Sequence, residues 1–132
     1  MIVIDSSALI AIVTGEAERS SFIDAILSSS EPVMSAVNHF ETRTVLLRRA
    51  GDKPLRDLQD FLEVGRIGVR AFDHDQSRAA FAAYRRYGKG SGHKAQLNLC
   101  DCAAYALARS LDLPLLFKGD GFARTDVRSA LA

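Results

Sequence analysis

Short, wholly apolar runs that alternate with helical segments are the feature that most limits how this 132-residue chain can fold. The runs at residues 2–4 and 115–117 contain no polar residue, as expected of strands that are covered on both faces. Between them, apolar side chains recur at the spacing of an amphipathic helix. This alternation predicts an α/β domain with a mainly parallel sheet.

The same pattern predicts where the individual elements lie. Four strands are expected, near residues 2–4, 32–34, 67–69 and 114–117. Six helices are expected, over residues 8–13, 17–28, 36–50, 53–64, 74–87 and 99–111. Side chains suited to helix N-caps precede four of them: Asp5, Ser35, Asp73 and Asn98. Residues 118–132 are expected to be loop-like, with one candidate edge strand near Val127.

Composition excludes several classes of protein. The chain is 48% hydrophobic and 25% charged, which is typical of a globular domain rather than a disordered segment. Its 17 basic and 16 acidic residues give a net charge of +1, which argues against a bulk electrostatic nucleic-acid binder. Cys100 and Cys102 are too close on a helix for a disulfide, and they indicate a reducing cytosol. Neither a signal peptide nor a membrane span is expected.

Carboxylates lie at several of the predicted element boundaries. Four are candidates for one site: Asp5, Glu41, Asp101 and Asp120. Ligands of parallel sheets bind beyond the carboxyl ends of the strands, and Asp5 and Asp120 both follow predicted strands. Acids that converge there favour a hard-metal site. Each acid also has a purely structural interpretation, as a helix cap, a first-turn acid, an arginine partner or a turn residue.

A local basic cluster accompanies the acids. Its members lie at the end of one predicted helix and in the glycine-rich loop that follows: Arg85, Arg86, Lys89, His93 and Lys94. Lys118 lies near the last acid. These side chains are candidates for contacts with RNA phosphates, and the alternative is a solvated helix end and loop. We expect Tyr84 and Tyr87 to be core or interface residues rather than platforms for bases.

Taken in order, these motifs resemble the VapC-type toxins among the PIN-domain nucleases. The resemblance begins with Met1-Ile2-Val3-Ile4-Asp5-Ser6-Ser7 and continues through Ser35-Ala36 and Glu41. It includes Tyr87-Gly88-Lys89-Gly90 and Asp101-Cys102, and it ends with residues 115–126. Together these segments cover essentially the whole chain.

The resemblance implies a fold, an activity and partners. The fold would be one PIN domain over residues 1–132, an α/β/α sandwich with a central, mainly parallel sheet of four to five strands. The activity would be that of an Mg²⁺- or Mn²⁺-dependent endoribonuclease, the toxin of a type II toxin–antitoxin system in a bacterial or archaeal cytoplasm. The partners would be RNA, a second copy in a homodimer, and a VapB-type antitoxin seated on the helices expected between residues 36 and 64, with no membrane involved.

The resemblance also assigns roles to individual residues. Asp5, Glu41 and Asp101 match the three core acids of the family. We expect Asp5 and Asp101 to bind metal directly, and Glu41 to bind it directly or through a water that it helps to orient. Ser7 is expected to orient a carboxylate, unless its hydroxyl serves only the start of a helix.

The fourth acid of the family departs from the usual pattern. Similar toxins often have an acid immediately before the phenylalanine that is Phe122 here, and this chain has Gly121 at that place. Three arrangements remain open. Asp120 takes over the role, Asp126 contributes from further along, or the site uses three acids.

Two other functions compete with the nuclease. A haloacid-dehalogenase-type phosphatase normally needs a second acid two residues after the first, where this chain has Ser7. A non-catalytic PIN-like module would bind RNA or protein without cleavage, and divalent ions would stabilise it little. The three matched acids argue against such a module.

Overall fold

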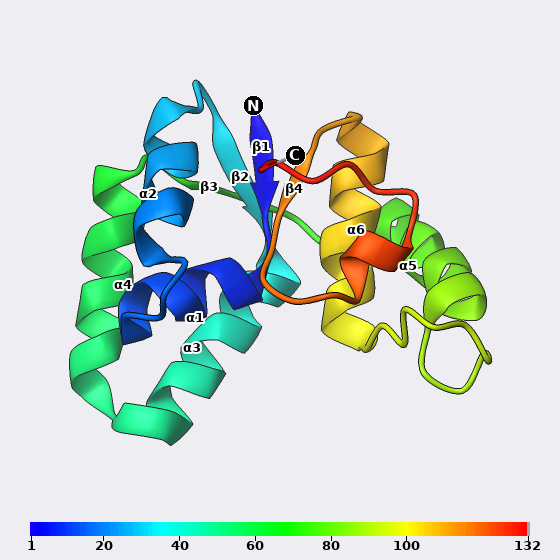
Figure 1. Cartoon of the computed structure of the whole chain (residues 1–132), viewed down its shortest axis with the longest axis horizontal. Helices are drawn as coiled ribbons and strands as arrows, with labels where there is room; N and C mark the ends of the chain where they lie inside the picture. The colour runs from blue at the N-terminus through cyan, green and yellow to red at the C-terminus, as the bar shows by residue number, and fades with distance from the viewer. Residues whose placement is uncertain (132) are drawn as a thin grey trace.

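Four parallel strands form one sheet at the centre of the computed structural model, which describes residues 1–131 (Figure 1). The strands are β1 (Ile2–Ile4), β2 (Pro32–Ser35), β3 (Gly68–Arg70) and β4 (Leu115–Leu116). Their order is β3-β2-β1-β4, and Val3 pairs with Val33 on one side and Leu115 on the other. The strand that ends at Asp5 is therefore interior to the sheet.

Helices cover both faces of this sheet. They are α1 (Ser6–Thr14), α2 (Arg19–Ser28), α3 (Ala36–Ala50), α4 (Asp52–Val64), α5 (His74–Tyr87) and α6 (Leu99–Leu111), with a short 3-10 helix at Phe122–Arg124. Helices α1 to α4 lie on one side and α5 and α6 on the other (Figure 1). The expected α/β/α sandwich is confirmed.

Alternation along β1 explains why both layers are apolar. Val3 packs into a core with residues of α5 and α6, whereas Ile2 and Ile4 pack into a second core with residues of α1 to α4. Successive side chains of a strand point to opposite faces, so one three-residue strand contributes to both cores. Because both cores bury this strand, the end that carries Asp5 is held rigidly.

Most boundaries agree with the sequence-based expectations to within two residues, and the differences have local causes. β3 begins at Gly68 rather than Ile67, because the Ile67 N–H donates to the Leu62 carbonyl and closes the end of α4. The candidate edge strand is a single parallel bridge between Leu115 and Ser129. Within residues 1–131, no helix is both long and apolar enough to cross a bilayer.

Candidate active site

Three helices begin at the carboxyl end of the sheet, and each carries one of the predicted acids. α1 follows β1, α3 follows β2, and α6 starts at the same end of the molecule (Figure 1). Asp5 is the N-cap of α1, Asp101 lies in the first turn of α6, and Glu41 lies in the second turn of α3. Helix N-termini carry partial positive charge, so this edge favours anionic groups.

Asp5 is buried, with 3% of its surface exposed. Its Oδ2 accepts hydrogen bonds from the Ser7 N–H at 3.0 Å and from the Ser7 hydroxyl at 2.6 Å. Burial, together with the charges of Asp101 and Glu41, raises the pKa of Asp5 to about 7 against the opposing bonds from Ser7. Ser7 is thus both a helix-start residue and the group that orients this carboxylate.

Asp101 is held by its own helix. Its carboxylate accepts from the Asn98 N–H at 3.0 Å, and the Asn98 side chain accepts from the Asp101 N–H at 2.8 Å, which together form a capping box. Burial raises the pKa of Asp101, and the charge of Glu41 adds to the shift, while the bond from Asn98 and the charge of Lys89 oppose it. The Asp101 carboxylate is therefore both a partner in the capping box and a candidate metal ligand.

Glu41 links the other two acids electrostatically. Its charge raises the pKa of both Asp5 and Asp101. It also lies against the Cys100 thiol, whose pKa burial and Glu41 together raise to about 12, so that this thiol is neutral. The three acids, from three separate elements, therefore form one anionic neighbourhood.

In the part of the chain that the structure describes, the acidic side chains do not form a preformed metal-binding site. Among residues 1–131, no group of three or more acidic, histidine or cysteine side chains is already arranged to hold an ion. Like charges repel, and Asp5 and Asp101 are each turned toward hydrogen-bond donors of their own. The donor set nevertheless fits Mg²⁺ or Mn²⁺, because it offers carboxylate oxygens whose repulsion a cation would relieve.

A PIN-domain family model matches residues 2–128 of the chain. The chain is a PIN-domain protein. It is 44% identical to ribonuclease VapC42 of Mycobacterium tuberculosis over 97% of this chain and 98% of that protein. It is also 44% identical to ribonuclease VapC of Mycolicibacterium smegmatis, over 95% and 96% of the two chains. Among PIN domains, it therefore belongs with the VapC ribonucleases.

Solved structures agree on the fold. The crystal structure of M. tuberculosis VapC20, a toxin that cleaves the sarcin–ricin loop, superimposes with a TM-score of 0.78 at 17% identity and covers 96% of each chain. A toxin–antitoxin complex from Klebsiella pneumoniae gives a TM-score of 0.68 at 17% identity, over 93% of this chain and 91% of that one. At such identities the likeness supports the PIN fold alone.

The two candidates for the fourth acid, Asp120 and Asp126, differ in their contacts. Asp120 is exposed, and among residues 1–131 its carboxylate has no hydrogen-bond or ion-pair partner. A side chain at position 121 would also be crowded, since its Cβ would lie 3.2 Å from the Ala95 carbonyl oxygen. Asp126 bonds instead to the Tyr105 hydroxyl and pairs with Arg86 and Arg109.

The predicted basic residues fall into two groups, one still available to RNA and one already paired with acids of the chain. Lys89 is close enough to Asp101 to oppose the shift in its pKa, and Arg85 is exposed at the end of α5. Arg86 is occupied by Asp126 and lies over the Tyr87 ring. Lys118 is occupied as well, since its Nζ lies 3.1 Å from Glu16 and 3.5 Å from Glu18.

One site residue gave no signal in the sequence. Asn38 lies on α3, one turn before Glu41, and is completely buried. Its amide Nδ2 approaches Asp5 Oδ1 at 3.5 Å and donates to Ser6 Oγ and to the Cys100 carbonyl, each at 3.1 Å. The sequence shows that Asn38 lies one helical turn before Glu41, but this spacing alone does not show whether the Asn38 side chain faces inward.

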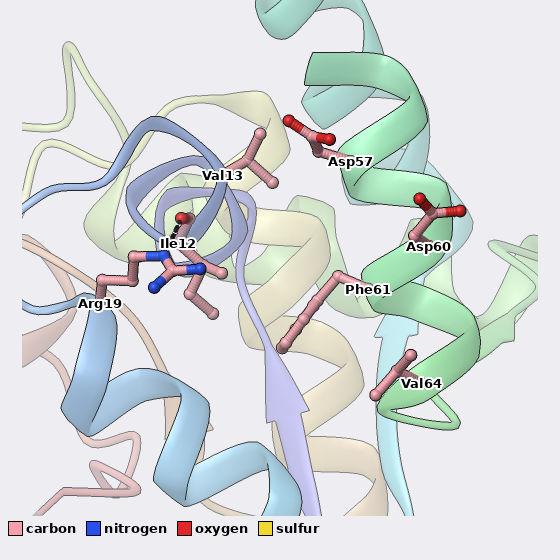
Figure 2. Close-up of a pocket in the computed structure, with 7 residues that line it drawn as sticks. All are labelled: Ile12, Val13, Arg19, Asp57, Asp60, Phe61 and Val64. Atoms are coloured by element: carbon pink, nitrogen blue, oxygen red, sulfur yellow. Dashed lines mark hydrogen bonds between the residues drawn. The ribbon is translucent and has the colours of Figure 1, made fainter. Parts of the chain in front are cut away.

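Three surface clefts lie apart from the acids. One, between α1 and α4, is lined by Ile12, Val13, Arg19, Asp57, Asp60, Phe61 and Val64 (Figure 2). A second, between α3 and α4, includes Phe40 and Leu47. The third is an apolar groove of ≈ 420 Å³, lined mainly by α5 and α6 and including Phe81 and Leu99. None of these three clefts is lined by Asp5, Glu41 or Asp101.

Proposed function

We propose that this VapC ribonuclease is a toxin that cleaves RNA internally at a divalent-metal site formed by Asp5, Glu41 and Asp101. One observation carries the proposal: the three acids come from three elements, and Asp5 and Asp101 each have a pKa raised by burial and by the charge of Glu41. Mutually repelling carboxylates at the carboxyl edge of a parallel sheet suit a cation that binds phosphate.

Each acid has a distinct role in this proposal. Asp5 and Asp101 hold the ion, and their positions are maintained by Ser7 and by the Asn98 cap. Glu41 completes the site and orients the attacking water. A divalent ion bound there supplies charge neutralisation of the scissile phosphate and lowers the pKa of water.

RNA reaches this acidic pocket through nearby positive charge. Lys89 is the best placed of the basic candidates, because its charge already acts on Asp101. Arg85 is exposed on the neighbouring helix end and is the second candidate. Phosphate contacts of this kind position RNA without reading its sequence.

A site of three acids is better supported than one of four. Asp120 is exposed and unpaired within residues 1–131, while Asp126 is engaged by Tyr105 and two arginines. We therefore assign Asp120 and Asp126 no direct part in binding the ion. Glycine at position 121 has a separate, local reason, because a larger residue there would crowd the Ala95 carbonyl.

Cleavage of total RNA tests the proposal directly. The purified chain is incubated with Mg²⁺ or Mn²⁺ and with EDTA, beside the matched variants Asp101→Asn and Asp120→Asn. We expect discrete metal-dependent fragments from the wild type and from Asp120→Asn, and none from Asp101→Asn. Equal loss in both variants would restore a four-acid site. Intact RNA under every condition, without stabilisation by metal, would point to a non-catalytic binding module.

The clefts suggest where two partners bind. We propose that a VapB-type antitoxin packs along α3 and α4, where Phe40 and Leu47 are 68% and 51% exposed. The adjoining cleft has Asp57 and Asp60 on its rim (Figure 2), of which Asp57 already pairs with Lys53 at 3.0 Å and Asp60 suits a basic segment. A second copy of the chain would cover the groove of α5 and α6, where Phe81 and Leu99 are 65% and 74% exposed.

A further inference from the structure

Asn38 connects the three elements that carry the acids. It stands on α3 with Glu41 one turn beyond it. Its Nδ2 reaches Ser6 and Asp5, at the junction of β1 and α1, and the carbonyl of Cys100, which directly precedes Asp101 on α6. The Ser6 hydroxyl returns a bond to the Asn38 carbonyl at 3.2 Å. Within residues 1–131, no other side chain hydrogen-bonds to both the Asp5 segment and the start of α6.

The surroundings fix which way the amide faces. A backbone carbonyl only accepts hydrogen bonds, so the –NH₂ end must be the end turned toward the Cys100 carbonyl, and the same nitrogen faces Asp5. The opposite end, Oδ1, is buried and has no hydrogen-bond partner among residues 1–131. A buried acceptor without a donor destabilises the fold, and an apolar side chain of similar size would avoid that cost. The bonds of Nδ2 are therefore the reason that an amide suits this position.

We propose that Asn38 is a positioning residue that sets the spacing of Asp5, Glu41 and Asp101 for the metal. This inference rests on the proposed function. Asn38 does not touch RNA, because it is completely buried. It acts through the Asp5 carboxylate and through the Cys100 carbonyl, which fix the two acids relative to Glu41 on its own helix. Partners that orient metal ligands typically contribute about 10- to 100-fold in metal affinity or activity.

Thr42 provides a matched control. It is also completely buried on α3, and its hydroxyl donates to the Asn38 carbonyl at 2.7 Å and, among residues 1–131, makes no hydrogen bond to an acid. Thr42→Val removes a buried polar group from the same helix while leaving the Nδ2 bonds in place. A general loss of packing would affect both positions, whereas loss of positioning would affect only Asn38.

The test compares Asn38→Ala, Asn38→Ser and Thr42→Val with the wild type. Mn²⁺ affinity is measured by electron paramagnetic resonance, and kcat and KM are measured for RNA cleavage. We expect both Asn38 variants to lose about 10- to 100-fold in Mn²⁺ affinity and kcat, with KM for RNA unchanged. Thr42→Val should stay within about twofold of the wild type on each measure. Asn38→Ser keeps a polar group in the core, so it serves if Asn38→Ala does not fold.

Distinct outcomes separate this inference from the proposed function. A folded Asn38 variant with wild-type Mn²⁺ affinity and kcat would overturn the positioning role, and so would an equal loss in Thr42→Val. A wild-type chain that neither binds Mn²⁺ nor cleaves RNA would instead overturn the metal-dependent nuclease itself.

Discussion

At the scale of single residues, the site is built around Asp5, a carboxylate that the fold buries close to other negative charges. Asp5 is buried beside two other acids, and the donors that face it are Ser7 and, more distantly, Asn38. These bonds do not offset the burial, so the pKa of Asp5 rises from 3.8 to about 7. A cation would supply the missing counter-charge, so metal binding and stability should be coupled at this residue.

This coupling predicts an unusual dependence of stability on pH without metal. Between about pH 4 and 7 the native state keeps a proton on Asp5 that the unfolded chain has lost, so stability falls as pH rises through that window. In EDTA at pH 8, Asp5→Asn should therefore be more stable than the wild type, by at most about 4 kcal/mol. The gain should shrink toward pH 4. Asparagine can still cap α1, so the helix start is kept.

Urea denaturation at pH 5 and pH 8 measures the effect. Asp24→Asn, at an exposed position of α2, is the control and should show no such gain. A wild-type chain whose metal-free stability rises between pH 5 and pH 8, with no advantage for Asp5→Asn, would show that Asp5 ionises without cost.

At the scale of elements, helix caps could be predicted from the sequence, whereas hydrogen bonds between distant segments could not. Ser35 and Asn98 were predictable caps because each accepts a backbone N–H no more than three residues away. The bonds of Asn38 to Asp5 and Cys100 span 33 and 62 residues, and only the assembled fold brings those partners together. The sequence also left open whether Asp120, Asp126 or neither serves as the fourth acid, because periodicity does not encode the path of an irregular loop.

The loops also decide which basic residues are free to meet RNA. Lys118 is held by Glu16 and Glu18, and this contact raises its pKa, whereas the charge of Lys89 acts on Asp101. Each phosphate contact in single-stranded RNA contributes about 0.7 to the slope of log affinity against log salt. Lys89→Ala should therefore lower that slope by about 0.7, and Lys118→Ala should lower it by clearly less.

Fluorescence anisotropy with a labelled RNA in EDTA, over a range of KCl concentrations, gives both slopes without cleavage. Arg66→Ala, at an exposed position after α4, is the control and should leave the slope unchanged. A larger decrease for Lys118→Ala than for Lys89→Ala would mean that RNA displaces Glu16 and Glu18 from Lys118.

At the scale of the whole molecule, the two helical layers present different apolar surfaces. Phe40 is exposed on α3, in the layer of α1 to α4, and Phe81 is exposed on α5, in the opposite layer (Figure 1). The acids lie between these surfaces, at the carboxyl edge of the sheet. If a VapB-type antitoxin and a second copy of the chain bind where we propose, they can bind at the same time without competing for one face.

Two matched substitutions test that separation. Phe81→Glu places a charge in the α5 and α6 groove, so it should convert a dimer to a monomer while antitoxin binding persists. Phe40→Glu does the same at the α3 and α4 cleft, so it should weaken binding of a VapB-type antitoxin by at least about tenfold while the dimer persists.

Light scattering after size exclusion reports the dimer, and calorimetric titration with a purified antitoxin that binds the wild type reports the second interface. Both aromatic rings are largely exposed, so neither change should unfold the chain. If Phe40→Glu broke the dimer and Phe81→Glu abolished antitoxin binding, the two faces would be assigned the wrong way round.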